Sequence, residues 1–374
     1  MIKKIKAILL KERGNKFYRF LDYYVGIPIV FLFGIFKRKN QNLNSEVKCI
    51  GLLKTAGIGD IVILSAIVNE IKNRYPHCKI VLFVGSNNYE IAKIMNRGII
   101  IEKISFLNLL KSIKLIRNYK FDYFVDFDPW PRINAILSFF SKSKVKIGFK
   151  TNKQFRHYIY DLIVVHSNRI HEIDNYRNLV RFFINDFKFF PEIKLDYSIK
   201  ANFAVVHMYA GGINSQLKEM SESGYINLIL KILPFFDRIY LTGSKTDSNK
   251  IDKILKALND KKIISVAGKL DLIGVIKLIG AAKVVISVNT GIMHIASAIG
   301  TPLIALHGPT NPQRWGPLSK NSIIIKSTLA CSPCLNLGFE YGCKKNKCMQ
   351  AIDIDDIVEK LKIIIGINKS RLSC

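Results

Sequence analysis

The chain has 374 residues, of which 49% are hydrophobic and 23% charged, a balance that excludes a disordered or fibrous protein. Its length suits roughly two domains of ordinary size, each able to bury its own core. The net charge of +29 favours anionic partners, but the basic residues are spread through the chain without an aromatic RNA-binding signature, so we expect no nucleic-acid function.

Residues 1–45 form a basic and apolar N-terminal extension, with ten Lys/Arg and two acidic residues. It contains an uncharged run of 14 residues, Tyr23 to Phe36, followed by three basic residues. A spanning helix needs about 20 apolar residues, and Gly26 and Pro28 weaken helix formation inside the run. We expect either peripheral attachment to an anionic membrane surface on its cytoplasmic face, or a short helix packed on the protein's own surface.

From Lys48 onward, short β-branched runs alternate with longer helical patterns, which is typical of parallel βαβ units. In the first half we predict strands Cys49–Leu53, Lys79–Val84, Tyr123–Asp126 and Val145–Gly148, and helices Ile61–Arg74 and Asn88–Met95. In the second half we predict strands Phe203–His207, Arg238–Leu241, Ile263–Val266, Val284–Val288 and Leu303–Leu306, and helices Ser221–Leu233, Asp247–Leu258, Leu272–Ile279 and Ile292–Ile299.

This α/β pattern predicts two doubly wound domains that face each other across a cleft, at 46–195 and 200–350, with a junction near Phe189 to Asn202. A C-terminal helix and tail follow at 351–374. Ligands of such sheets lie beyond the carboxyl ends of the strands, so the loops after strands are where function is expected.

The first of these loops is Leu53-Lys54-Thr55-Ala56-Gly57-Ile58-Gly59-Asp60, which opens directly into a helix. Its two glycines permit a tight turn and place Asp60 at the helix start. Asp60 is either a helix N-cap, accepting hydrogen bonds from backbone N–H groups, or a general base for an attacking hydroxyl.

Two loops of the second half suit a phosphate. Gly211 and Gly212 follow a strand and lead to Lys218, which is either a phosphate contact or an ordinary surface lysine. In Val288-Asn289-Thr290-Gly291-Ile292-Met293-His294, a strand ends and a small-residue helix begins. The N–H groups at such a helix start attract a diphosphate, although the small residues and His294 also suit close packing.

Together these segments resemble glycosyltransferase family 9, the bacterial heptosyltransferase family of lipopolysaccharide assembly. The resemblance rests on Gly57-Ile58-Gly59-Asp60, the glycine loop leading to Lys218, Leu241-Thr242-Gly243-Ser244, and above all Asn289 to Ala298 running into Leu306 to Pro317. It implies a GT-B fold of two Rossmann-like domains and no cofactor. It further implies inverting, metal-independent transfer of heptose or a related sugar from a nucleotide diphosphate donor, ADP-heptose by default. The implied acceptor is a lipopolysaccharide core or another cell-surface glycan or glycolipid.

The resemblance also assigns residues. It implies that Asp60 is the catalytic base and that Lys218 stabilises the departing diphosphate. It implies that Asp247 binds the ribose and that Leu270 contacts the nucleoside base. Asp126 and Arg132 are implied to face the acceptor. Asn289 stands where heptosyltransferases have an aspartate that contacts the donor sugar, so the sugar stays open. The implied donor-binding set is Gly59, Gly211, Gly212, Asp247, Leu270, Asn289, Thr290, Gly291, Ile292, Met293 and His294.

Three alternatives stay open. Asp126-Phe127-Asp128 also matches the D-x-D of metal-dependent glycosyltransferases. Cys331, Cys334, Cys343 and Cys348 could hold zinc, or could be structural or redox-sensitive thiols in a reducing cytoplasm. A non-catalytic protein that binds anionic envelope components or RNA would also explain the charge, but not the ordered loops.

Overall fold

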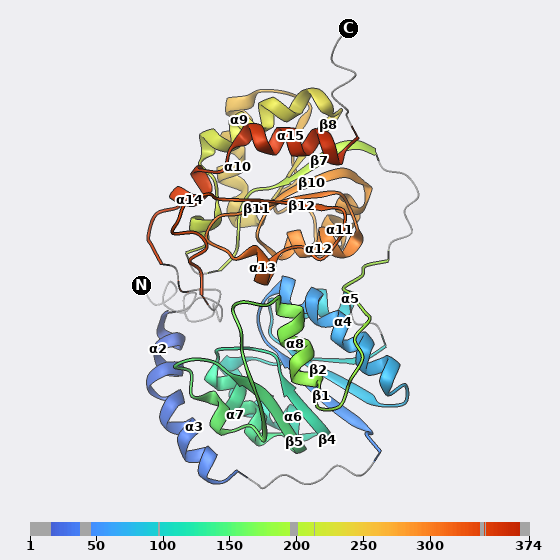
Figure 1. Cartoon of the computed structure of the whole chain (residues 1–374), viewed down its shortest axis with the longest axis vertical. Coiled ribbons are helices and arrows are strands. Elements are labelled where there is room, and N and C mark those ends of the chain that lie inside the picture. The colour runs from blue at the N-terminus through green and yellow to red at the C-terminus, as the bar shows by residue number, and fades with distance from the viewer. Residues whose placement is uncertain are drawn as a thin grey trace. The chain divides into compact units, whose positions relative to one another are not determined.

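The computed structural model describes residues 16–37, 46–95, 98–194, 201–212, 214–336, 340 and 342–366. Parts of the N-terminal extension, of the predicted junction and of the C-terminal tail therefore lie outside the described residues. The chain divides into two compact units, Met1–Phe189 and Phe190–Cys374. Figure 1 shows each unit as a parallel sheet flanked by helices.

The sheet of unit 1 has the strand order β3-β2-β1-β4-β5-β6, and every pairing is parallel. The order runs outward in both directions from β1 and β4, and right-handed crossovers therefore place helices on both faces. Its strands are β1 (Cys49–Lys54), β2 (Lys79–Val84), β3 (Ile100–Lys103), β4 (Lys120–Asp126), β5 (Lys142–Lys150) and β6 (Leu162–Val165).

The sheet of unit 2 repeats this topology, with the parallel order β12-β11-β10-β7-β8-β9. Here the order runs outward from β7 and β10. Its strands are β7 (Ala201–His207), β8 (Arg238–Thr242), β9 (Ile263–Ser265), β10 (Ala282–Val288), β11 (Leu303–His307) and β12 (Ser322–Lys326).

Several helices begin and end at recognisable capping residues. Ser221 and Asp271 accept hydrogen bonds from backbone N–H groups at the starts of the helices Glu222–Ile232 and Leu272–Ala281, and Gly300 ends the helix Gly291–Ile299 in the left-handed conformation. In unit 1 the helices after the N-terminal extension are α4 (Ile58–Arg74), α5 (Tyr89–Met95), α6 (Leu109–Arg117), α7 (Arg132–Phe140) and α8 (Glu172–Val180). In unit 2 they are α9 (Glu222–Ile232), α10 (Ser248–Leu258), α11 (Leu272–Ala281), α12 (Gly291–Ile299), α13 (Pro312–Trp315), α14 (Lys347–Gln350) and α15 (Ile354–Ile364).

The structure confirms every strand and helix predicted from Cys49 to Leu306, with ends that differ by at most three residues. It adds the helices α6, α7, α8, α13 and α14, none of which was predicted. It also adds the strands β3, β6 and β12. All three are edge strands whose residues are mostly half-buried or exposed, so they lack the continuous apolar run of a central strand.

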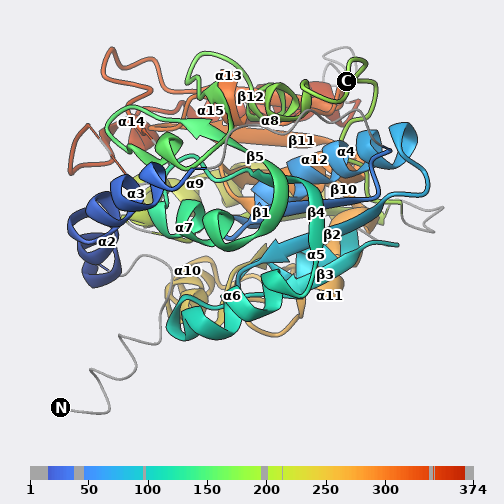
Figure 2. The ribbon, with the colours of Figure 1, turned by 90° about the horizontal axis from the view of Figure 1, so that it is seen from below.

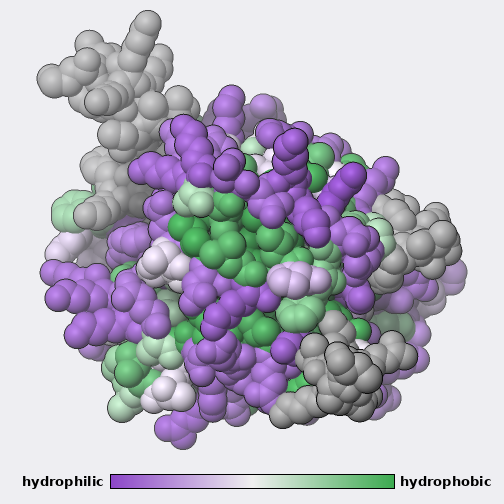
Figure 3. Space-filling view, turned by 90° about the horizontal axis from the view of Figure 1, so that it is seen from above, coloured by the Kyte–Doolittle hydropathy of each residue, from purple (hydrophilic) through white to green (hydrophobic). Residues whose placement is uncertain are grey.

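The cores lie between the sheets and their helices. Central strands such as β1 and β10 are buried along almost their whole length, which parallel sheets covered on both faces require. In unit 2, α9 and α15 pack together over this core and carry the exposed side chains Leu230 and Ile363. Figure 3 looks onto unit 2 and shows hydrophobic side chains gathered in a patch that hydrophilic ones surround.

The described part of the N-terminal extension forms two short helices, α2 (Lys16–Tyr24) and α3 (Gly26–Ile35). Gly26 and Pro28 do not prevent a helix here, and the expected short helix packed on the protein's own surface is present. Helix α3 begins at Gly26, so Pro28 lies in the first turn, where a missing N–H breaks no helical hydrogen bond. Figure 1 shows α2 and α3 along the flank of unit 1 that carries α7, and Val30 of α3 is buried in a cluster with Ala135 of that helix. Within the described ranges, no helix combines the length and apolarity needed to cross a membrane.

We expect Val30→Ala to lower the free energy of unfolding by about 2 kcal/mol, because it leaves a cavity where α3 packs on α7. Leu32→Ala is the matched control on the same helix, since Leu32 is 52% exposed, and should change stability by less than about 0.5 kcal/mol. Urea unfolding of the full chain measures both. Equal effects would mean that α3 does not pack as described.

Candidate active site

The topology marks one ligand-binding region in each unit. In a doubly wound sheet, ligands bind beyond the carboxyl ends of the two strands where the order reverses. In unit 1 these strands are β1 and β4. Asp60 lies in the first turn of the helix after β1, and Asp128 lies in the loop after β4. In unit 2 they are β7 and β10, whose following loops carry Lys218 and Thr290.

Asp60 is the third residue of α4 and is not its N-cap, so that interpretation was wrong. The N-cap is Gly57, at φ 90, and a side chain at Gly57 would collide with the Asp60 carboxylate, which a Cβ would approach to 1.7 Å. That carboxylate accepts a hydrogen bond from the Tyr176 hydroxyl at 2.9 Å and lies 3.2 Å from Lys54 Nζ. Its side chain is 32% exposed. Asp60 is thus held from the protein side and open to solvent.

Asp128 organises the residues behind Asp60. Its carboxylate accepts hydrogen bonds from Lys54 Nζ at 2.8 Å, from the Thr55 N–H at 2.7 Å and hydroxyl at 2.9 Å, and from Asn134 Nδ2 at 2.6 Å. All four residues are buried. The network fixes the last residue of β1 against the loop after β4, and so fixes the start of α4.

The neighbouring carboxylates keep Lys54 charged. Burial alone would lower the pKa of Lys54, but the carboxylates of Asp128 and Asp60 outweigh it and raise the pKa, so Lys54 stays protonated. Burial raises the pKa of Tyr176 well above its ordinary value, and the neighbouring Asp60 raises it further. Tyr176 therefore stays a hydrogen-bond donor to Asp60.

Lys54, Thr55, Asn134 and Tyr176 were not predicted as site residues from the sequence, and Asp128 was considered only as part of the D-x-D alternative. The sequence could have pointed to Lys54 and Asp128. Lys54 is a charged residue at the end of the buried strand β1, and Asp128 lies two residues after the end of the buried strand β4. No such pattern marks Tyr176. It lies 116 residues from Asp60, inside α8, and only the tertiary structure brings its hydroxyl to that carboxylate.

Asp126, predicted to face the acceptor, is completely buried. Its carboxylate accepts hydrogen bonds from Arg156 and from the Tyr160 hydroxyl, at 2.6 Å for the latter. Asp126 and Asp128 are thus each satisfied by a buried cation, which disfavours the D-x-D metal alternative. Among the described residues, no group of three or more His, Cys, Asp or Glu is placed to hold a metal ion.

Arg132, the other predicted acceptor residue, is 3% exposed. Its guanidinium pairs with Asp22 of α2 at 2.9 Å and donates to the Lys153 carbonyl at 3.2 Å. Burial raises the pKa of Asp22, while the Ile133 N–H and Arg132 act in the opposite direction. Asp126 and Arg132 therefore hold unit 1 together, and we assign neither of them to the acceptor.

In unit 2, helix α12 begins as the sequence predicts. Thr290 is its N-cap and accepts a hydrogen bond from the Ile292 N–H at 3.2 Å, while Gly291 and Ile292 stay partly exposed. Asn289 and His294 are 8% and 7% exposed, and Met293 is fully buried. Asn289 Nδ2 donates to the Trp315 carbonyl at 2.9 Å. The helix start is thus the part of this segment that solvent reaches.

Lys218 ends the short helix η3 (Ser215–Lys218), and its side chain is partly exposed. Burial lowers the pKa of His307, at the end of β11, to about 4, and the positive charge of Lys218 contributes to this decrease. Gly211 and Gly212 earlier in this loop are exposed, and Gly212 has φ 107, which favours glycine.

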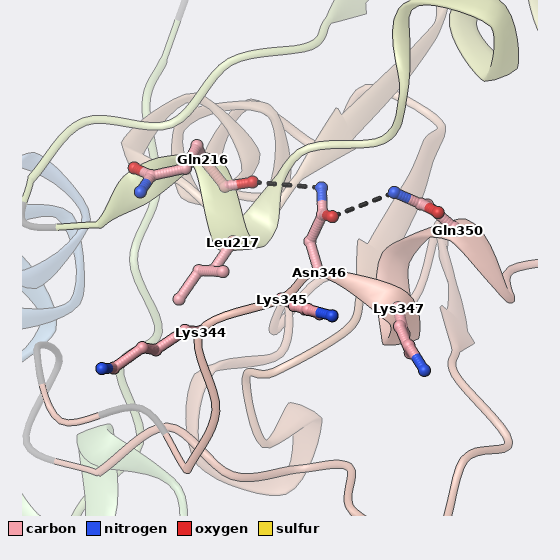
Figure 4. Close-up of a pocket in the computed structure, with 7 residues that line it drawn as sticks. All are labelled: Gln216, Leu217, Lys344, Lys345, Asn346, Lys347 and Gln350. Carbon is pink, nitrogen blue, oxygen red and sulfur yellow. Dashed lines mark hydrogen bonds between the residues drawn. The ribbon is translucent and has the colours of Figure 1, made fainter.

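A basic pocket lies beside this loop. Asn346 Nδ2 donates to the carbonyls of Gln216 at 3.4 Å and Glu219 at 2.9 Å, and so holds the turn that carries Lys218. Figure 4 shows Asn346 pointing at Gln216 while Gln350 donates to it. The pocket measures about 370 Å³ and is lined by Gln216, Leu217, Lys344, Lys345, Asn346, Lys347 and Gln350.

Asp247 and Leu270 lie in the loops after β8 and β9. Asp247 accepts a hydrogen bond from the Ser244 N–H at 2.8 Å, and Leu270 is 39% exposed. The two loops touch at Gly268, where a Cβ would approach the Lys245 backbone to 2.8 Å. Gly59 of the predicted set is buried at the second position of α4 in unit 1.

The four clustered cysteines are free thiols. Burial raises the pKa of Cys334 and Cys348, with further contributions from the neighbouring thiols, so these two stay protonated at neutral pH. Cys348 also packs under Gly308, where a Cβ would approach its sulfur to 3.1 Å. We assign a packing role to Cys348 alone, since Cys331 and Cys343 are exposed.

Residues 109–345, more than half of the chain, match the model of glycosyltransferase family 9 (heptosyltransferase). The chain belongs to this family. Lipopolysaccharide heptosyltransferase 2 of Salmonella typhimurium is 28% identical to this family 9 chain over 134 residues, which are 35% of the chain and 38% of that protein. The match thus spans well under two thirds of that relative.

Two further comparisons cover most of the chain. The lipopolysaccharide core heptosyltransferase OpsX of Haemophilus influenzae is 22% identical over 347 residues, 84% of this chain and 96% of that protein. The structure of the Escherichia coli ADP-heptose lipopolysaccharide heptosyltransferase II has a TM-score of 0.68 at 17% identity, over 85% of this chain and 98% of that one. This likeness confirms the predicted GT-B fold class.

We expect Arg156→Met to lower the free energy of unfolding by about 3–5 kcal/mol, because it leaves the Asp126 carboxylate buried without a counter-charge. The double variant Arg156→Met/Asp126→Asn should recover much of this loss, since Asn is neutral and keeps an acceptor for the Asp128 N–H. Urea unfolding measures both. An acceptor KM that rises in Asp126→Asn at unchanged stability would instead support the acceptor role.

Proposed function

We propose that this family 9 chain transfers a glycosyl unit from a nucleoside diphosphate sugar to a lipopolysaccharide-core or other cell-surface glycan acceptor. The observation that carries the proposal is the Asp60 carboxylate, fixed by Tyr176 and Lys54 yet one-third exposed at the switch point of unit 1. The names of the relatives make ADP-heptose the default donor, and Asn289 leaves the sugar open.

In the proposed reaction, Asp60 takes the proton from the attacking acceptor hydroxyl. Lys54 lies closer to Asp128, at 2.8 Å, than to Asp60, at 3.2 Å. Asp128 is therefore the nearer partner of the Lys54 ammonium, which leaves the Asp60 carboxylate the more weakly paired of the two. Tyr176 and Lys54 aim the carboxylate, so little reorganisation is needed when the proton moves. Direct attack on the anomeric carbon inverts its configuration.

The departing nucleoside diphosphate is proposed to bind unit 2. The first N–H groups of α12 lack intrahelical partners and carry the positive end of the helix dipole. Together with Lys218 they supply fixed positive charge where a divalent ion would otherwise act, so we propose transfer without a metal. Asp247 and the exposed Leu270 are proposed contacts of the ribose and the base.

The acceptor determines where the enzyme works. A lipopolysaccharide core is attached to a membrane lipid, so we propose that the chain acts on the cytoplasmic face of an anionic membrane. The net charge of +29 supports this location, because basic residues near a surface are attracted to anionic headgroups.

We expect Asp60→Asn to lower kcat by roughly 10²–10⁴-fold, because the amide cannot accept the proton, while donor affinity stays within about twofold. Asp174→Asn is the matched control, since Asp174 is an exposed acid on α8, the helix that carries Tyr176. Transfer is assayed in EDTA with the donor that most raises the melting temperature among ADP-, GDP-, UDP- and dTDP-sugars. Unchanged kcat in Asp60→Asn would refute the base assignment, and activity that requires added Mg²⁺ would restore the metal-dependent alternative.

A further inference from the structure

Helix α3 turns an apolar face to solvent. Its exposed positions are Pro28, Phe31, Leu32 and Ile35, spaced three, four and seven residues apart, so they lie along one stripe of the helix. On a helix that packs on a globular domain, the stripe that faces solvent is normally polar. Here the opposite stripe, with Gly26 and Val30, is buried against unit 1, so α3 is apolar on both sides.

The exposed stripe is part of a larger feature, the apolar ridge, made of Phe20, Tyr24, Phe31, Leu32, Ile35 and Phe36. Their exposed fractions lie between 41% and 77%. The ring of Phe31 also contacts Tyr158 and Phe155 of the neighbouring loop at centroid distances of 4.6 and 5.7 Å, and both of those rings are exposed. Figures 1 and 2 show α2 and α3 together at the outer edge of unit 1. Such a continuous apolar surface marks an interaction site.

The charges around the ridge select its partner. From Lys16 to Lys37 the only acidic residue is Asp22, and its carboxylate is turned inward to Arg132. Lys37 and Lys150 lie near enough to His157 to help burial lower its pKa, and Lys153 is exposed in the same loop. Tyr and Phe rings flanked by lysines suit the boundary between lipid headgroups and acyl chains.

We propose that the apolar ridge docks on the interface of an anionic lipid bilayer, with its rings among the upper acyl chains and the nearby lysines on lipid phosphates. This deepens the membrane-surface part of the proposed function. Binding alone tests it, so its failure is distinguishable from a failure of glycosyl transfer. A second copy of the chain is the alternative occupant.

The test compares the full chain with Leu32→Gln/Ile35→Gln on vesicles of phosphatidylcholine with and without phosphatidylglycerol. We expect the wild type to bind the anionic vesicles more strongly than the neutral ones, and the variant to lose at least about tenfold in partitioning, since two buried aliphatic side chains are removed. Leu107→Gln/Leu110→Gln is the matched control, with two exposed leucines at the same spacing elsewhere in unit 1. It should bind like the wild type.

Two outcomes would overturn this proposal. One is equal partitioning of the wild type and Leu32→Gln/Ile35→Gln. The other is a wild-type dimer in light scattering that the variant converts to a monomer while neither binds vesicles, which would assign the ridge to a second copy. Melting temperatures of all three proteins show that the differences do not arise from unfolding.

On their inner side, α2 and α3 pack against α7. Helix α7 begins after Pro131, which has no side-chain acceptor to cap it. Asp22 of α2 takes that place. Its Oδ1 accepts hydrogen bonds from the Arg132 N–H at 2.8 Å and the Ile133 N–H at 3.0 Å, and its Oδ2 pairs with the Arg132 guanidinium.

The turn that Asp22 caps leads to the candidate base. Asn134, the next residue of α7, donates to Asp128, which accepts from Lys54, which lies against Asp60. Each link is a short contact, at 2.6, 2.8 and 3.2 Å in turn, and the link from Asp128 to Lys54 joins residues 74 apart in the sequence. A shift of the α7 start is therefore transmitted to the carboxylate through three side chains.

We infer that Asp22 is a positioning residue for Asp60, an inference that rests on the proposed function. Asp22→Ala should lower kcat about tenfold or more per folded molecule at unchanged donor KM, because the donor residues belong to unit 2. Asp22→Asn should restore most of kcat, since its amide oxygen still accepts from both N–H groups.

Unchanged kcat in Asp22→Ala, or a donor KM that rises with the loss, would refute the positioning role. Failure of the proposed function has a different signature, because Asp60→Asn would then stay active.

Discussion

The buried ion pair between Lys54 and Asp128 is the constraint on which unit 1 depends. It joins the end of β1 to the loop after β4, across 74 residues of sequence, at the point where the strand order reverses. A buried ammonium and carboxylate are tolerated only when paired and hydrogen-bonded, and here Thr55 and Asn134 complete the bonding of Asp128. The geometry of Asp60 follows, because α4 starts a few residues beyond Lys54.

Unit 2 has the same strand order and a different chemistry at its switch point. Its loops there present a helix start, glycines and a lysine, where unit 1 presents carboxylates. This division suits a transfer in which one group must accept a proton while another must accept negative charge on the leaving diphosphate. The same doubly wound scaffold serves both tasks, because the loops after the strands vary independently of the core.

The N-terminal helices α2 and α3 have an inner face that packs on α7 and an outer face that is exposed. Inward, Val30 and Asp22 bind α3 and α2 to α7, one through apolar packing and the other through backbone hydrogen bonds and an ion pair. Outward, the apolar ridge is exposed. Asp22 is the sole acid of the segment, and its inward turn leaves the outer face apolar and basic.

The sequence by itself determined the two βαβ series and the family likeness, because strand runs, glycine turns and helix caps are local patterns. It placed Asp60, Lys218 and Thr290 after the strands β1, β7 and β10 for the same reason, while their roles stay predictions. Only the tertiary structure decided which side chains face solvent. Asp126 ends β4 and Arg132 lies shortly after it, near Asp128 in the sequence. Yet Asp126 is paired with Arg156 and Arg132 with Asp22, both distant along the chain. A local sequence pattern does not reveal partners so distant, and Tyr176 was missed for the same reason. The edge strands β3, β6 and β12 were missed because their half-exposed residues form no continuous apolar run.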